Sequence, residues 1–219
     1  MQKILITAFE PFGNDTINPT EGILERIPDF LYDVKVIKQT LPVVYNHAFE
    51  RLVPLIEKHN PELILLLGLS KGRSHVCLER VAINVSDGKL PDNLGTALSH
   101  ETIEAQGPDG LFTSLPVKII EQRFKDRKQT AVISNTAGTY VCNNLYYKTL
   151  HYVKTFSKKA KVGFIHVPAT PAMVHDQTGM PSMRVTEMYE AIMTIIDTVI
   201  NPVDIKETAQ KVKGAQKVK

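Results

Sequence analysis

The sequence predicts a single α/β domain with a twisted, mixed but mostly parallel sheet flanked by helices. Two observations predict this fold. Short apolar segments rich in β-branched residues alternate with longer segments of helical period, and loops rich in Gly, Pro, Asn and Asp follow several of the apolar segments. With 219 residues, 43% of them apolar and 22% charged, the chain can bury a core as one soluble domain without disulfides or a structural metal.

Each expected element follows from its own pattern of apolar residues. Short apolar runs bounded by turn-forming residues predict strands at residues 3–8, 34–40, 62–68, 130–134 and 161–167. Apolar residues at helical spacing predict helices at residues 43–59, 116–124 and 182–200, and Pro202 ends the last of these. We expect the domain to cover residues 1–205 and the lysine-rich residues 206–219 to be a disordered tail.

The segment from residue 75 to 87 departs from a regular strand. Its apolar residues alternate up to Leu78 and resume out of phase at Val81, with Glu79 and Arg80 at the break. A change of phase indicates a bulge or bend, which can turn a polar side chain toward a site. Loops at 10–19, 70–74, 87–95 and 135–139 follow predicted strands, so we expect them to converge where α/β sheets bind ligands.

Composition excludes several classes of function. The formal net charge is +3, and the tail supplies several of the lysines, so the body has no excess of basic residues of the kind nucleic acid requires. The first residues lack a secretory signal and no apolar run approaches the roughly 20 residues of a membrane span, so we expect a cytoplasmic protein without membrane contact. Cys77 and Cys142 are too far apart for a CxxC motif, and no histidine pair has metalloprotease spacing. We therefore expect no metal.

Cys142 lies at the predicted start of a helix that follows a strand and a glycine-bearing loop. Unpaired N–H groups and the positive end of the helix dipole favour a thiolate at such a position, which predicts a lowered pKa and a nucleophile. Cysteines are also common core residues, so a buried structural cysteine is an equally simple interpretation.

His166 and Glu79 are candidates for the partners of this thiol. His166 ends an apolar strand that Pro168 interrupts, where an imidazole can accept the proton of a thiol and later protonate a leaving amine. Glu79 is a candidate to orient that imidazole. The simpler alternatives are a hydrogen-bonded histidine at a strand end and a carboxylate that is solvated or paired with Arg80.

Six ordered motifs cover most of the chain: TAFEPFG at 7–13 with Asn18-Pro19, GLSKGR at 68–73, ERVAIN at 79–84, PDN at 91–93, SNTAGTYVCN at 134–143 and GFIHVP at 163–168. Together they resemble the pyrrolidone-carboxylate peptidases, also called pyroglutamyl peptidase I, a family of cysteine peptidases. The resemblance implies a phosphorylase/hydrolase-like fold, a homotetramer, no cofactor, and removal of an N-terminal pyroglutamyl residue from peptides. It also implies that Cys142 is the nucleophile, His166 the general base and then acid, and Glu79 the residue that orients it.

The resemblance further implies a pocket for the lactam ring, formed by aromatic and aliphatic side chains: Phe9, Phe12, Val43, Leu90, Tyr140 and Val141. A flat neutral ring suits such a pocket. The sequence departs from the family pattern at the mouth of the site, at Ala8, Asn14, Lys71 and Lys89.

Two rival functions stay open. An amidotransferase-like thiol hydrolase also places a cysteine between a strand and a helix, although it expects glycines around the cysteine, and residues 140–144 contain none. A catalytically silent binding module for pyroglutamyl peptides is the second rival.

Overall fold

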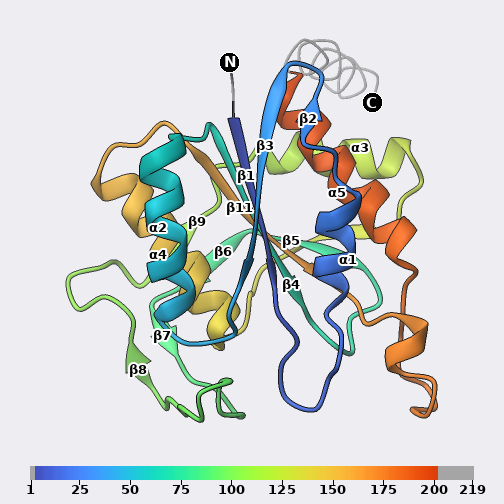
Figure 1. Ribbon diagram of the computed structural model, residues 1–219, viewed down its shortest axis with the longest axis horizontal. Coiled ribbons are helices and arrows are strands. Elements are labelled where there is room, and N and C mark those ends of the chain that lie inside the picture. Colours follow the sequence, from blue (N-terminus) through green and yellow to red (C-terminus); the bar gives the residue numbers. More distant parts are fainter. Residues whose placement is uncertain (1–2, 202–219) are drawn as a thin grey trace, which may run out of the picture.

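The computed structural model describes residues 3–201, which form one α/β domain (Figure 1). The strands are β1 (Lys3–Phe9), β2 (Phe30–Leu31), β3 (Val34–Leu41), β4 (Leu63–Leu69), β5 (Val76–Glu79), β6 (Val81–Ile83), β7 (Val85–Ser86), β8 (Glu101–Thr102), β9 (Gly110–Phe112), β10 (Ala131–Ser134) and β11 (Lys161–Val167). The helices are α1 (Pro19–Arg26), α2 (His47–His59), α3 (Val117–Asp126), α4 (Val141–Thr155) and α5 (Val185–Ile200), with one 3₁₀ turn, η1 (Pro171–Met173).

The central sheet has seven strands in the order β10-β5-β11-β4-β1-β3-β2. Strands β3, β1, β4 and β11 are parallel to one another, and β5 is antiparallel to β11. Strand β10 runs parallel to β5, and the short β2 is antiparallel to β3. Two small sheets, β6-β9 and β7-β8, complete the fold. The predicted fold class, a mixed and mostly parallel sheet flanked by helices, is thus confirmed.

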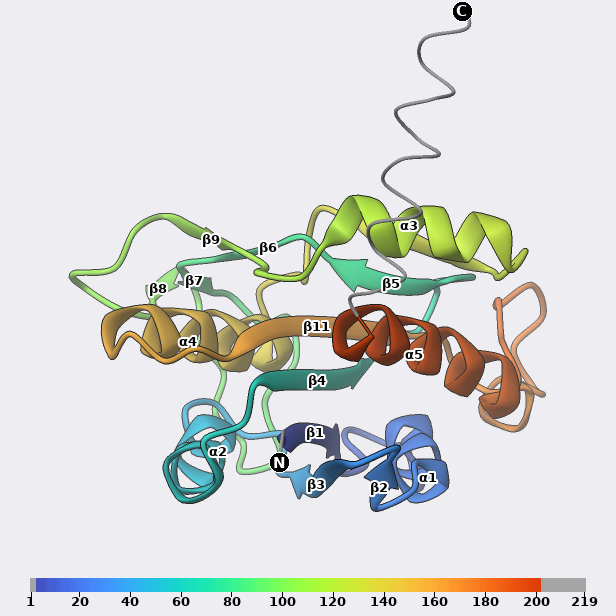
Figure 2. The same ribbon diagram turned by 90° about the horizontal axis from the view of Figure 1, so that it is seen from above.

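Helices cover both faces of the sheet. Helices α2 and α4 lie on one face, and α1, α3 and α5 lie on the other (Figures 1 and 2). Strand β4 is apolar throughout because it is buried on both sides: Ile64 and Leu66 pack toward α2 and α4, and Leu65 and Leu67 pack toward α1 and α5. This alternation decides which side chains of β4, β11 and β5 share a face.

Three helices differ from the expected elements, and the short strands β2, β8 and β9 were not expected. No helix was expected after the loop at 10–19, yet α1 begins at Pro19, capped by the Asn18 side chain, which accepts from Thr20 N–H at 3.1 Å. The helix expected at 43–59 begins only at His47, because Asn46 has a φ of 60° and the Tyr45 N–H donates to Asp92 instead. The helix expected at 182–200 begins at Val185.

The expected tail at 206–219 lies outside the described residues. Among residues 3–201, no helix is both long enough and apolar enough to cross a membrane.

Helix α5 contributes Ile192, which is fully buried in the core beneath α1 and α3. We predict that Ile192→Ala lowers the free energy of unfolding by about 2–5 kcal/mol, because it removes buried methyl groups and leaves a cavity. Urea unfolding followed by circular dichroism measures this change. Glu190→Ala, on the exposed side of the same helix, is the control and should stay within about 0.5 kcal/mol of the parent chain. Equal losses of unfolding free energy in both variants would contradict the burial of Ile192 of α5 in the core.

Candidate active site

His166 lies near the end of β11, with only 4% of its surface exposed. In the sheet it pairs with Gly68 of β4 on one side and with Cys77 of β5 on the other. Two residues earlier, Phe164 packs in the core beneath α2 and α4, and its ring centroid lies 4.8 Å from that of His166. Because side chains two residues apart on a strand share a face, the imidazole lies on the side of the sheet that α4 covers.

Glu79 ends β5, at the point where the chain leaves the central sheet for β6. The break in alternation predicted a bend here, and the change from one sheet to another confirms it. The Glu79 side chain is completely buried, and its Oε1 accepts from His166 Nδ1–H at 2.8 Å. Tyr146 of α4 donates its hydroxyl to the Glu79 carbonyl at 3.0 Å, which holds the bend against the helix. The carboxylate therefore fixes the orientation of the imidazole ring.

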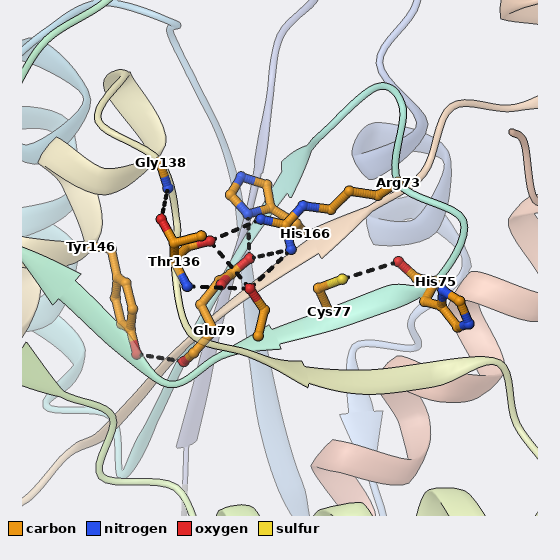
Figure 3. Close-up of polar contacts among 9 residues, drawn as sticks. Arg73, His75, Cys77, Glu79, Thr136, Gly138, Tyr146 and His166 are labelled. Atoms are coloured by element: carbon orange, nitrogen blue, oxygen red, sulfur yellow. Dashed lines mark hydrogen bonds and ion pairs between the residues drawn. The ribbon is translucent and has the colours of Figure 1, made fainter. Parts of the chain in front are cut away.

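Arg73 is the cation beside Glu79. Its Nη1 lies 3.0 Å from the same Oε1 that His166 contacts, and the contacts of both residues converge on this carboxylate (Figure 3). Arg80 was the only ion-pair partner expected for Glu79, because Arg80 follows Glu79 directly in the sequence. Arg80 is exposed, and the partner comes from the β4–β5 loop. The GLSKGR motif contained Arg73, but nothing in its spacing from Glu79 indicated contact.

Cys142 is the second residue of α4. Its Sγ lies 3.0 Å from the position that a Cβ at Gly68 would occupy, and Gly68 pairs with His166. Paired residues of parallel strands point to the same face of a sheet. The thiol therefore lies over β4, on the same side of the sheet as the imidazole on the neighbouring β11. The structure thus brings Cys142, His166 and Glu79 together at one face.

The charge state of the thiol differs from the expectation. Burial, and then the negative charge of Glu79, raise the pKa of Cys142 to about 12, while Arg73 and the backbone N–H of Cys142 oppose this rise. The lowered pKa expected from the helix start is therefore wrong, because removal from water outweighs the helix dipole. Burial likewise lowers the pKa of His166, against the opposing effect of Glu79. Both shifts favour a neutral thiol and a neutral imidazole over a thiolate–imidazolium pair.

The start of α4 leaves backbone donors near this thiol. Tyr140 is the N-cap residue, and within residues 3–201 no side chain caps the helix at this residue. The first N–H groups of a helix have no partner inside it. They form a set of donors next to Cys142 Sγ that can stabilise a negatively charged oxygen.

A small cavity opens beside the thiol, lined by Phe9, Phe12, Asn18, Val43, Leu69, Tyr140 and Cys142. Four of the six predicted pocket residues are among these. Val141 is fully buried in the core, because the first turn of α4 turns its side chain toward the sheet. Leu90 is 60% exposed, because its loop presents backbone to the site: Tyr140 donates its hydroxyl to the Pro91 carbonyl at 2.9 Å. Asn18 and Leu69 were present in the sequence motifs but were not predicted to line the pocket.

Two of the departures from the family pattern have clear positions. Lys71 Nζ lies 2.6 Å from Asp15 Oδ1, and this ion pair joins the β4–β5 loop to the loop before α1. Lys89 is exposed in the loop that carries Leu90. A larger cavity, lined by residues that include Lys3, His59 and Lys161, lies at the opposite edge of the parallel strands and contains none of the reactive residues. Within the described part of the chain, no group of three or more His, Cys, Asp or Glu residues could hold a metal ion.

Comparisons with known proteins agree with this geometry. The sequence model of the family described as pyroglutamyl peptidase matches residues 2–202. Pyrrolidone-carboxylate peptidase from Thermococcus onnurineus is 41% identical over 199 residues, which cover 90% of this chain and 98% of the relative. Pyrrolidone-carboxylate peptidase 2 from Caldanaerobacter subterraneus subsp. tengcongensis is 38% identical over 198 residues, 90% of this chain and 96% of the relative.

Solved structures give the same result. A mutant of pyrrolidone carboxyl peptidase from Pyrococcus furiosus superposes with a TM-score of 0.88 at 36% identity, covering 92% of this chain and 100% of that one. Pyroglutamyl peptidase I from Bacillus amyloliquefaciens superposes with a TM-score of 0.84 at 32% identity, covering 89% and 92%. The chain belongs to the pyroglutamyl peptidase family.

Proposed function

We propose that this protein hydrolyses the bond between an N-terminal pyroglutamyl residue and the rest of a peptide, with Cys142 as nucleophile, His166 as general base and acid, and Glu79 as the residue that orients His166. One observation carries the proposal: a buried imidazole–carboxylate pair lies on the same face as a thiol that lines a small apolar cavity. Family membership supports the substrate class.

The cavity suits the pyroglutamyl ring. Phe9, Phe12 and Tyr140 supply aromatic surface for a flat, neutral lactam, and Cys142 lines the same cavity, next to the carbonyl that a bound ring would present. Among residues 3–201, no carboxylate lines the cavity to bind an α-ammonium group. This absence fits a substrate whose N-terminal nitrogen is locked in the ring as an amide.

The reaction proceeds through an acyl-enzyme. Because the thiol and imidazole are both neutral beforehand, His166 takes the proton of Cys142 as Sγ attacks the pyroglutamyl carbonyl. N–H groups at the start of α4 stabilise the resulting oxyanion. The imidazolium, stabilised by Glu79, then gives its proton to the departing amine as the C–N bond breaks. Water, deprotonated by His166, attacks the thioester and releases free pyroglutamate and the Cys142 thiol.

The cellular setting follows the same proposal. Cys77 and Cys142 are free thiols, and a nucleophilic thiol needs a reducing compartment such as the cytoplasm. The homotetramer that the family resemblance implies remains part of the proposal.

Replacing the nucleophile tests the role of Cys142. We predict that Cys142→Ser lowers kcat/KM for a fluorogenic pyroglutamyl amide by at least about 10³-fold while leaving the unfolding midpoint near that of the parent chain. Cys77→Ser is the control, because a hydroxyl can keep the 3.3 Å hydrogen bond to the His75 carbonyl. Equal losses in the two variants would refute the assignment of the nucleophile. Well-folded, reduced parent protein with no turnover would instead support the silent binding module.

Gly68 tests the position of the thiol. A Cβ at this residue would lie 2.8 Å from the Phe164 ring and 3.0 Å from Cys142 Sγ, so one of them must move. We predict that Gly68→Ala lowers kcat by about 10²-fold, since a displacement of about 1 Å is enough for such a loss. Gly22→Ala is the control, because its Cβ would meet only Arg26 at an ordinary 3.5 Å. Full activity of Gly68→Ala would show that the thiol works elsewhere than in this position.

The pH dependence tests the role of His166. A general base must be neutral, and burial lowers the pKa of His166 below its ordinary value of 6.5. We therefore predict that the acid limb of kcat/KM, where the imidazole gains a proton, has its midpoint below pH 6.5. Glu79→Gln removes the charge that raises this pKa, so it should move the acid limb to still lower pH while reducing the rate. A parent acid limb with its midpoint above 6.5 would contradict the assignment.

A further inference from the structure

The Glu79 carboxylate is in an unfavourable place for a charge. It is fully buried, and its Oε2 has no hydrogen-bond partner among the described residues. Taking a charged carboxylate out of water is unfavourable unless a cation or hydrogen-bond donors lie close to it. The buried Glu79 side chain therefore requires a positively charged group beside it while His166 is neutral.

Arg73 meets this requirement. Its guanidinium lies 3.0 Å from Glu79 Oε1, and its side chain is 24% exposed, so the cation keeps some contact with water. His166 is neutral before the reaction, so its 2.8 Å hydrogen bond alone brings no positive charge to the carboxylate. The charge that balances Glu79 in the resting site is that of Arg73.

The same guanidinium also binds the chain that leads to the thiol. Nη1 donates to Ser134 Oγ at 3.1 Å, and Nη2 donates to the Thr136 carbonyl at 2.8 Å. Both acceptors precede α4, whose second residue is Cys142. Figure 3 shows the contacts of Arg73 with Thr136 and with Glu79 arising from one side chain. Arg73 thus joins three separate segments: the β4–β5 loop, the end of β5 and the loop from β10 to α4.

We infer that Arg73 is a positioning residue of the active site, which holds Glu79 against His166 and fixes the loop that leads to Cys142. This inference rests on the proposed function. The planar, forked guanidinium is suited to binding a carboxylate and a carbonyl at once, whereas the single ammonium of lysine is not.

Arg73 has an electrostatic effect that a purely structural residue would lack. The ionisable groups around it are Cys77 and Glu79 of β5, His166 of β11 and Cys142 of α4, and its charge lowers the pKa of both His166 and Cys142. Glu79 has the opposite effect on each of these two groups. Removing Arg73 and removing Glu79 should therefore move the pH profile in opposite directions.

The experiment compares Arg73→Met, Arg73→Lys and Glu79→Gln, with Arg80→Met as the control that removes an exposed arginine next to Glu79. For Arg73→Met we expect kcat on a pyroglutamyl amide to fall about 10–100-fold, as for other residues that orient a reactive group, with KM changed less than about threefold. Its acid limb should move to higher pH, whereas that of Glu79→Gln moves to lower pH. Arg73→Lys should restore the parent acid limb but only part of kcat, and Arg80→Met should behave as the parent.

Two results would overturn the inference: an Arg73→Met enzyme with parent kcat, or an Arg73→Met enzyme that loses kcat while its acid limb stays at the parent pH. If Arg73→Met does not fold, Arg73→Lys decides, because parent kcat in that variant shows that the fork is not needed. Iodoacetamide labelling of Cys142 separates this inference from the proposed function, since it needs no substrate. The pH midpoint of labelling should rise in Arg73→Met even if the parent protein cleaves no pyroglutamyl amide, and an unchanged midpoint counts against Arg73.

Discussion

The candidate active site depends on one buried carboxylate. Glu79 lies at the end of a short strand, wholly enclosed by protein, and a single oxygen receives both the imidazole of His166 and the guanidinium of Arg73. Several features of the fold serve this arrangement: β5 lies between β11 and β10, the chain bends directly after Glu79, and the hydroxyl of Tyr146 holds that bend against α4. A buried charge is unfavourable unless it is paired, so the segments that carry His166 and Arg73 must be held in contact with Glu79.

Much of the fold followed from the sequence because the strands are short, apolar and separated by clear turn residues. Helix α1 did not, because its eight residues contain only two buried aliphatic side chains, Ile23 and Leu24, too few to show a period. The start of α2 was misplaced because Val43 and Val44 continue the apolar stripe, although a left-handed residue at Asn46 separates them from the helix. Patterns of hydrophobicity report burial, and they do not report backbone conformation.

The candidate trio of Cys142, His166 and Glu79 could be named from motifs, but its energetics could not. Arg73 was missed because its contact joins the β4–β5 loop to the end of β5 and leaves no periodic signal, and sequence proximity pointed to Arg80 instead. The pKa of Cys142 was predicted in the wrong direction because the helix start is visible in the sequence, whereas the burial that outweighs it is a property of the packed chain. Leu90 does not line the cavity beside the thiol, because a motif gives a residue's position along a loop but not the direction of its side chain.

Gly68 has a consequence for how relatives of this protein should be judged. Cys142 Sγ lies where a side chain on β4 would otherwise project, so the space for the proposed nucleophile comes from an atom that is missing in a neighbouring strand. A homologue can therefore keep the cysteine, the histidine and the glutamate and still lack room for the thiol if a larger residue replaces this glycine. The three reactive residues are not a sufficient signature of a working enzyme in this fold. A survey for silent homologues should begin with the strand beneath the thiol.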